Sequence, residues 1–221
     1  MRAALLVALA GLLMPAIASA HPHIWISQIV RVVEQGGQYT AVELEWRFDP
    51  MTSEMEISTI DEDQDGKISP EEIDALVRDT LPALQEAGFM TWLNTGRADS
   101  RPVKAPTFAA RIDDPARFKP PEWNRSAGDK AGMPMPPNKQ VDPTAPNREV
   151  PRNLVYVMRF ELAHPTKVMS ITTYDPSDFV RFEVDKSTLP TGCTLSKHPS
   201  YKAEFIPGYP VRADLVICRL P

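Results

Sequence analysis

The residues best suited to chemistry lie in an acidic run at positions 61–72. Its sequence is Asp-Glu-Asp-Gln-Asp-Gly-Lys-Ile-Ser-Pro-Glu-Glu, which matches the EF-hand calcium loop D-x-[DN]-x-[DN]-G-x5-E without a mismatch. The expected oxygen ligands are Asp61, Asp63, Asp65, the Lys67 carbonyl, Ser69 and Glu72. Since Ca²⁺ takes about six to eight oxygen ligands, the loop predicts one Ca²⁺ site. The alternative is a solvated acidic turn that binds no ion.

The expected role of this ion is structural. Ser69-Pro70-Glu71-Glu72 combines an N-cap, a proline at the first helical position and a capping box, so a helix should begin where the loop needs it. Sensor EF-hands usually come in pairs, and this sequence has one. Outside the cytoplasm, a single hand with an affinity of about 10⁻⁴ to 10⁻³ M stays filled. The helix before the loop contains few apolar residues, so its folding should depend on the ion.

A second candidate site depends on export. Residues 1–20 resemble a secretory signal, with one positive charge, an apolar stretch and the small-residue end Ala18-Ser19-Ala20. Cleavage after Ala20 would leave His21 with both an α-amine and an imidazole, and His23 would add a second imidazole. These groups suit Zn²⁺, Ni²⁺ or Cu²⁺.

Pro22 restricts how this second site could bind a metal. Proline has no amide proton to lose, so the square-planar amino-terminal copper and nickel site cannot form. The site would use the amine and side chains, with His164 or His198 as a possible further ligand. The alternative is that His21 and His23 are ordinary polar residues at the start of a strand.

Composition disfavours several classes of binding partner. The net charge of −5 becomes −6 when the signal peptide, which carries one arginine, is removed, and this balance disfavours nucleic acid and anionic membranes. After residue 20 no stretch approaches the roughly 18 apolar residues of a membrane span. We therefore expect an exported protein without a membrane anchor.

The only two cysteines, Cys193 and Cys218, fit an oxidising compartment. A lone pair of this kind most often forms a structural disulfide. Two thiolate ligands for a metal are the alternative, which requires reduced sulfur.

Hydrophobic periodicity predicts an α+β fold. Residues 24–48 alternate with period two around Gly36-Gly37, which is typical of a β-hairpin, and further strands are predicted near residues 154–162, 168–174, 179–184 and 211–218. We expect one mostly antiparallel, sandwich-like β domain over residues 21–221. It would carry an EF-hand-like helical insertion at residues 52–88.

Two further features interrupt this pattern. Pro82 should kink or split the helix that follows the acidic loop near Thr80. Residues 113–152 hold nine of the 23 prolines with almost no periodicity, which predicts a long Pro-rich loop.

No enzyme is indicated. The sequence contains no G-x-S-x-G, no phosphate-binding glycine loop, no H-E-x-x-H and no paired carboxylates outside the acidic loop. An oxidative copper enzyme that uses the terminal histidine would need a second, well-placed histidine and a flat substrate surface, which the sequence does not indicate.

Several of these features together resemble a known family. The features that carry the resemblance are a signal peptide followed by His-Pro-His-Ile-Trp, the segment Trp-Arg-Phe-Asp-Pro-Met at 46–51, the acidic loop, an Asp-Pro-x-x-Phe turn at 175–179 and two late cysteines. The family is the bacterial periplasmic one catalogued as a domain of unknown function, which includes the periplasmic component of the Zev zinc-uptake system and is often described as an ABC-type transport periplasmic component. The Pro-rich span is longer than the family needs.

The resemblance implies a periplasmic location and an inner-membrane metal permease of the nickel/cobalt type as partner. Residue by residue, it points to His21 and His23 as ligands. The leading hypothesis is therefore a non-enzymatic accessory protein that supplies zinc or nickel to the permease, with calcium as a structural ion. The alternatives are a copper carrier with an N-terminal histidine site and a calcium-dependent interaction module that holds no transition metal.

Overall fold

The computed structural model describes residues 24–96, 106–114, 117, 152–177, 179–206 and 209–221. Their strands are β1 (Ile24–Gln35), β2 (Gln38–Phe48), β3 (Thr91–Asn94), β4 (Thr107–Asp113), β5 (Asn153–Thr166), β6 (Val168–Thr173), β7 (Val180–Val184), β8 (Cys193–Ile206) and β9 (Tyr209–Arg219). The helices are α2 (Pro50–Ile60), α3 (Pro70–Glu86) and the short 3₁₀ helices η2 (Gly88–Met90) and η3 (Lys186–Thr188).

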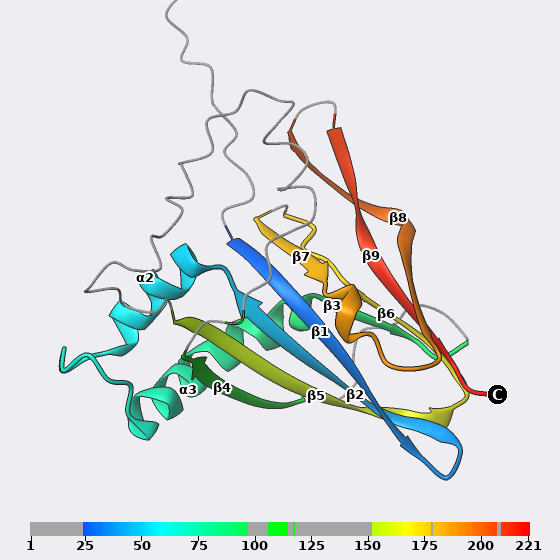
Figure 1. Ribbon diagram of the computed structural model, residues 1–221, viewed down its shortest axis with the longest axis horizontal. Helices are drawn as coiled ribbons and strands as arrows, with labels where there is room; N and C mark the ends of the chain where they lie inside the picture. The colour runs from blue at the N-terminus through cyan, green and yellow to red at the C-terminus, as the bar shows by residue number, and fades with distance from the viewer. Residues whose placement is uncertain (1–23, 97–105, 115–116, 118–151, 178, 207–208) are drawn as a thin grey trace, which may run out of the picture.

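The strands form two sheets. One has five strands in the order β4-β5-β2-β1-β7, and the other has four in the order β3-β6-β9-β8. Neighbouring strands in both sheets are antiparallel except β1 and β7, which are parallel. Figure 1 shows α2 and the acidic loop at one end of the molecule, with the β8–β9 hairpin at the opposite end and α3 behind the larger sheet. The predicted mostly antiparallel α+β fold is confirmed.

The predicted first hairpin is present. β1 and β2 are joined by Gly36 and Gly37, whose φ angles of 61° and 72° lie in the left-handed region. Two successive residues with positive φ match the twist of a hairpin, and glycine adopts them without steric cost. Val30 on β1 faces Leu44 on β2, and both are fully buried. The hairpin therefore provides one wall of the core.

Both sheets share one hydrophobic core. Trp46 of the larger sheet is in the same buried cluster as Met169 and Val216 of the smaller one, and Leu84 of α3 also belongs to it. The Trp46 ring lies 4.8 Å from that of Phe182, and its indole N–H donates to the side chain of a buried glutamine, Gln28, at 3.1 Å. Because the one polar atom of the tryptophan is paired, its burial carries no hydrogen-bond penalty.

The predicted disulfide also closes within this core. Cys193 on β8 lies directly opposite Cys218 on β9, and the two are bonded. The alternative of two thiolate metal ligands is therefore wrong. Within the described part of the chain, no helix has the length and hydropathy needed to cross a bilayer.

Three strands were not predicted from the sequence. β3 has only four residues, β4 contains two consecutive alanines, and β8 contains Pro199 together with several charged residues. Such compositions are weak evidence for strands. β3, β4 and β8 are all edge strands, where a proline or a charge is tolerated because one side of the strand makes no ladder bonds.

The helix is not split at Pro82, because α3 runs as one helix from Pro70 to Glu86. Pro82 is exposed, so water can bond to the helical carbonyl that proline leaves without a donor. Most of the Pro-rich span, residues 118–151, lies outside the described residues. Its flanks meet, because the Arg117 amide donates to the side chain of Asn153 at 2.7 Å.

Candidate calcium site

The helix before the acidic loop is attached to the first strand by Asp49. Asp49 caps α2 by accepting the Thr52 amide at 2.9 Å, and its other carboxylate oxygen accepts the Trp25 amide at 3.0 Å. The Asp49 amide in turn donates to the Trp25 carbonyl at 2.9 Å. An aspartate followed by proline is a typical helix start, so the cap could have been recognised from the sequence. Its contact with Trp25 could not.

A buried serine fixes the same helix to two further strands. The Ser53 hydroxyl donates to the Phe48 carbonyl at 3.2 Å and accepts the Leu154 amide at 3.1 Å. Farther along α2, Ile57 and Ile60 face inward and are buried. The first turn of α2 is thus bonded to β1, β2 and β5, which sets the direction in which the helix reaches the acidic loop.

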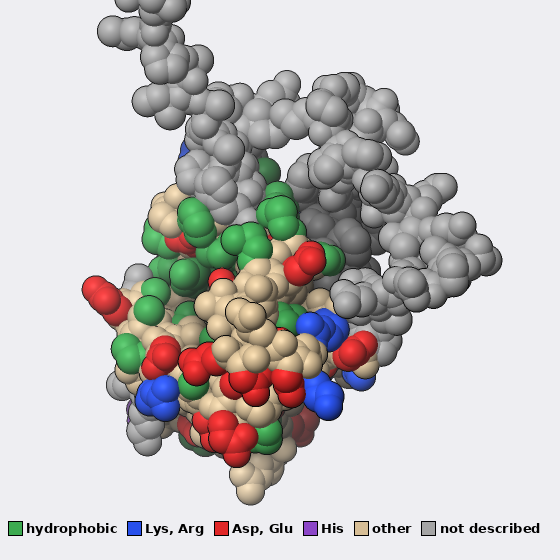
Figure 2. Space-filling model, turned by 90° about the vertical axis from the view of Figure 1, so that its left-hand side faces the viewer, with side chains coloured by type: hydrophobic (Ala, Val, Ile, Leu, Met, Phe, Trp, Pro, Cys, Tyr) green, Lys and Arg blue, Asp and Glu red, His purple; other side chains and the backbone are tan. Residues whose placement is uncertain are grey.

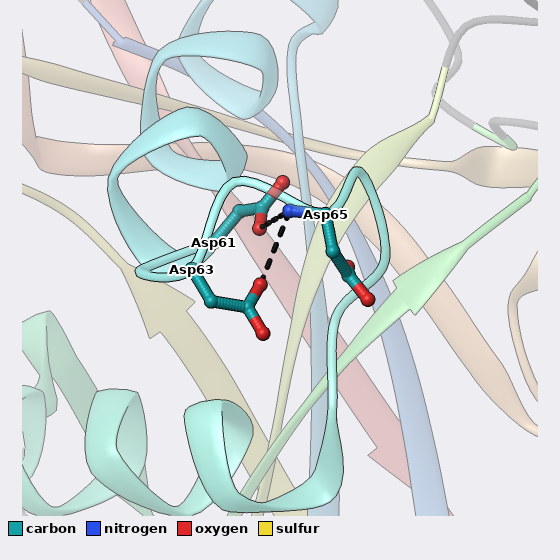
Figure 3. A group of neighbouring side chains, drawn as sticks. All are labelled: Asp61, Asp63 and Asp65. Atoms are coloured by element: carbon teal, nitrogen blue, oxygen red, sulfur yellow. Dashed lines mark hydrogen bonds between the residues drawn. The ribbon is translucent and has the colours of Figure 1, made fainter.

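Three of the predicted ligands lie together in this loop. Oxygen atoms of Asp61, Asp63 and Asp65 all lie within 4.8 Å of one another. Figure 3 shows Asp61 and Asp63 directing carboxylate oxygens at the backbone nitrogen of Asp65, each at 3.1 Å. The second oxygen of Asp61 accepts the Gly66 amide at 3.0 Å. Backbone donors thus hold the three carboxylates close to one another despite their like charge.

The backbone turns sharply between these ligands. Gly66 has a φ of 80°, a conformation that glycine adopts without the steric cost of a side chain. Gln64 also has a positive φ, of 59°. The Lys67 amide donates to the Asp65 carboxylate at 2.7 Å, which completes the turn. The glycine position of the motif therefore has the conformation that the motif requires.

Glu72 joins the two ends of the loop. One of its carboxylate oxygens accepts the Glu62 amide at 2.8 Å, and the other accepts the Ser69 amide at 2.8 Å. The Ser69 hydroxyl accepts the Glu72 amide, so the predicted capping box at the start of α3 is confirmed. In this arrangement Ser69 and Glu72 bond to each other and to the backbone, and Glu72 is not in the three-aspartate group.

One loop contact was not predicted. The guanidinium of Arg152 donates to the Gly66 carbonyl at 3.2 Å. This arginine directly precedes β5 and is 86 residues away along the chain, so no local pattern indicates the contact. It places one positive charge beside the aspartates.

The donor set fits a hard divalent cation. Asp61, Asp63 and Asp65 supply clustered carboxylates, and Glu72 supplies a fourth at the loop end. All of these groups are oxygen donors, which suit Ca²⁺, whereas structural zinc sites use cysteine and histidine. A bound Ca²⁺ would supply no chemistry beyond charge and coordination. Its effect would be to join α2 to α3.

The Glu72 carboxylate predicts a pH effect in metal-free protein. Hydrogen bonds from the Ser69 amide and hydroxyl and the Glu62 amide lower the pKa of Glu72 below its ordinary 4.5. Because the pKa is lower in the folded state, the stabilisation is present above pH 4.5 and is lost as the pH falls through the lowered value. We expect wild type to be more stable than Glu72→Ala at neutral pH, with the gap narrowing in acid. Chelator-treated samples melted by circular dichroism at several pH values would measure this, and a pH-independent gap would contradict it.

The predicted transition-metal ligands His21 and His23 lie outside the described residues. The next residue, Ile24, donates its amide to the Phe179 carbonyl at 3.3 Å. Of the possible further ligands, His164 is exposed on β5. His198 is buried, its Nδ1 accepts the Ser200 and Tyr201 amides at 3.2 and 2.9 Å, and its ring stacks on Tyr201. Nδ1 of His198 is thus engaged in the fold.

Comparison with known proteins places the chain in a family. A family model described as a protein of unknown function, DUF1007, matches residues 6–206. The chain belongs to this family. The DUF1007 match includes the His-Pro-His segment and the whole acidic loop, and it ends before β9. No curated protein and no solved structure matches the chain significantly.

Proposed function

We propose that this protein is an exported, non-enzymatic accessory protein of the periplasm. It holds a structural Ca²⁺ in the loop at residues 61–72 and supplies zinc or nickel to an inner-membrane permease of the nickel/cobalt type. The observation that carries the calcium part is the group of three aspartate carboxylates beside Glu72. The transport part rests on the His-Pro-His segment after the signal-like sequence and on the resemblance to the family of the Zev periplasmic component.

The anchoring of β1 supports a metal site at its start. The two residues after His23 are bonded to the body of the protein, Ile24 through Phe179 and Trp25 through Asp49. A ligand pair that directly precedes an anchored strand loses less conformational entropy on binding than one at the end of a long free tail. With the terminal amine, two imidazoles give three nitrogen ligands, a set that suits zinc or nickel.

Calcium has a supporting role in this proposal. The ion would hold α2 against α3, and α2 carries the Asp49 cap that contacts Trp25. Calcium would therefore stabilise the helical insertion and the region next to the start of β1. No residue is assigned a catalytic role.

The decisive experiment is native mass spectrometry of protein exported and processed by its host. We expect a mass that begins at His21, one Ca²⁺, and one further ion after addition of Zn²⁺ or Ni²⁺. The double variant His21→Ala/His23→Ala should lose the second ion and keep the calcium. Gln35→Ala/Gln38→Ala is the control, because both side chains are exposed at the β1–β2 hairpin and neither is a candidate ligand, and it should behave like wild type.

Each other outcome has a defined meaning. Unchanged zinc and nickel binding in the double variant would overturn the assignment of His21 and His23. A copper adduct alone would favour the copper carrier. Calcium without any transition metal in wild type would favour the calcium-dependent interaction module.

A further inference from the structure

Charge is unevenly distributed between the helical insertion and the rest of the chain. Residues 50–88 contain eleven acidic and two basic residues, whereas the remaining sequence contains 18 acidic and 22 basic residues. The net negative charge of the protein therefore comes from α2, the acidic loop and α3. One bound Ca²⁺ would offset only two of these charges. A strongly negative field around one surface attracts cationic partners and speeds their association.

The outer face of α2 is apolar within this acidic region. Met51 and Met55 are one turn apart, so they lie on the same side of the helix, and they are 64% and 65% exposed. The opposite side, which includes Ile57 and Ile60, is buried. Among the described residues, these methionines are the most exposed of the large hydrophobic side chains. Figure 2 shows hydrophobic side chains above a concentration of Asp and Glu on this end of the molecule.

The two observations together indicate a docking surface. Methionine is flexible and polarizable, and it is used on surfaces that accept apolar segments of varied shape. The acidic residues Glu54 and Glu56 lie on the same helix and are exposed, so they would contact positive charges that flank such a segment. We infer that the outer face of α2, defined by Met51, Met55 and Glu54, docks a cationic amphipathic segment of a partner protein. This inference goes beyond the proposed function and does not require the histidine site.

The negative charge of the helical insertion favours a cationic protein segment over a membrane as the partner of this surface. The surface of an anionic bilayer attracts basic segments and repels acidic ones, so the acidic insertion would be kept away from it. A protein segment that combines lysine or arginine with apolar residues matches both the methionines and the surrounding carboxylates.

Binding of a model peptide tests the inference. The probe is a fluorescein-labelled amphipathic helix of leucine and lysine, about 18 residues long and so about 27 Å when helical. Its counterpart has glutamate in place of lysine. Affinity is measured by anisotropy with saturating Ca²⁺ at low and high salt. We expect the leucine–lysine peptide to bind more tightly at low salt and the leucine–glutamate peptide not to bind.

Two sets of variants locate the site. Met51→Gln/Met55→Gln keeps side-chain length and helix propensity and should weaken binding at least 10-fold. Val168→Thr is the matched control, because Val168 is an exposed apolar residue on β6. This variant should bind the peptide like wild type. Glu54→Gln/Glu56→Gln should reduce the salt dependence of binding.

Three results would overturn the inference. They are no binding of the leucine–lysine peptide to wild type, equal binding of both peptides, and wild-type affinity in the methionine variant. Sedimentation of the protein without peptide would show whether it forms a dimer. A dimer that the methionine variant abolishes would assign the surface to a second copy of the chain instead of a cationic partner.

Discussion

Replacing Glu72 with glutamine is expected to weaken calcium binding by about 10- to 100-fold, because the loop loses one charged, potentially bidentate ligand. Glutamine can still accept backbone hydrogen bonds in a capping box, so Ser69 should remain the N-cap of α3. Isothermal titration with Ca²⁺ would measure the affinity. The calcium-induced rise in melting temperature should shrink in parallel, because an ion stabilises the folded state only to the extent that it binds.

Glu71→Gln is the matched control for this prediction. Glu71 is the adjacent carboxylate, it is exposed in the first turn of α3, and it does not occupy a ligand position of the motif. Its substitution removes the same charge and should change calcium affinity only slightly. Equal affinities for the two variants would mean that Glu72 does not contact the ion. Wild-type protein that does not bind calcium would overturn the calcium site altogether.

The second large effect, a loss of stability, is expected on substitution of Glu45. The side chain of Glu45 is only 4% exposed and forms ion pairs with three arginines. Its oxygens lie 2.9 Å from Arg31, 2.6 Å from Arg47 and 3.0 Å from Arg111. Burial raises the pKa of Glu45, but hydrogen bonds from Arg31 and Arg47 and the charges of Arg47 and Arg111 outweigh it, so the pKa falls below 4.5. Its stabilising contribution is therefore present above pH 4.5 and is lost as the pH falls through the lowered pKa.

Glu45→Gln should destabilise the protein by about 2 to 4 kcal/mol, because three guanidinium groups lose their shared buried carboxylate. Urea denaturation followed by tryptophan fluorescence at neutral pH would measure the change. Glu161→Gln is the control. Glu161 pairs with Arg159 at 2.7 Å, but the two side chains are 56% and 40% exposed, so its loss should cost less than about 0.5 kcal/mol. Equal costs for the two variants would show that the Glu45 cluster adds nothing beyond a surface ion pair.

The sequence by itself determined the elements that depend on neighbouring residues. The β1–β2 hairpin follows from alternating hydrophobicity around Gly36-Gly37, and the start of α3 follows from the capping box of Ser69 and Glu72. The grouping of Asp61, Asp63 and Asp65 follows from their spacing around a glycine turn. The helix cap and the aspartate group each form within about twelve residues, and the hairpin joins two strands that follow each other directly along the chain, so the local pattern indicates each of them.

Only the tertiary structure decided the contacts that join distant parts of the chain. The parallel pairing of β1 with β7, the bond from Arg152 to the acidic loop and the ion pair of Arg111 with Glu45 all link residues far apart in sequence. The same holds for β3, β4 and β8, whose weak strand composition is compensated by pairing with β6, β5 and β9. The physical reason is that strand pairing and burial stabilise these segments more than their local propensities disfavour them.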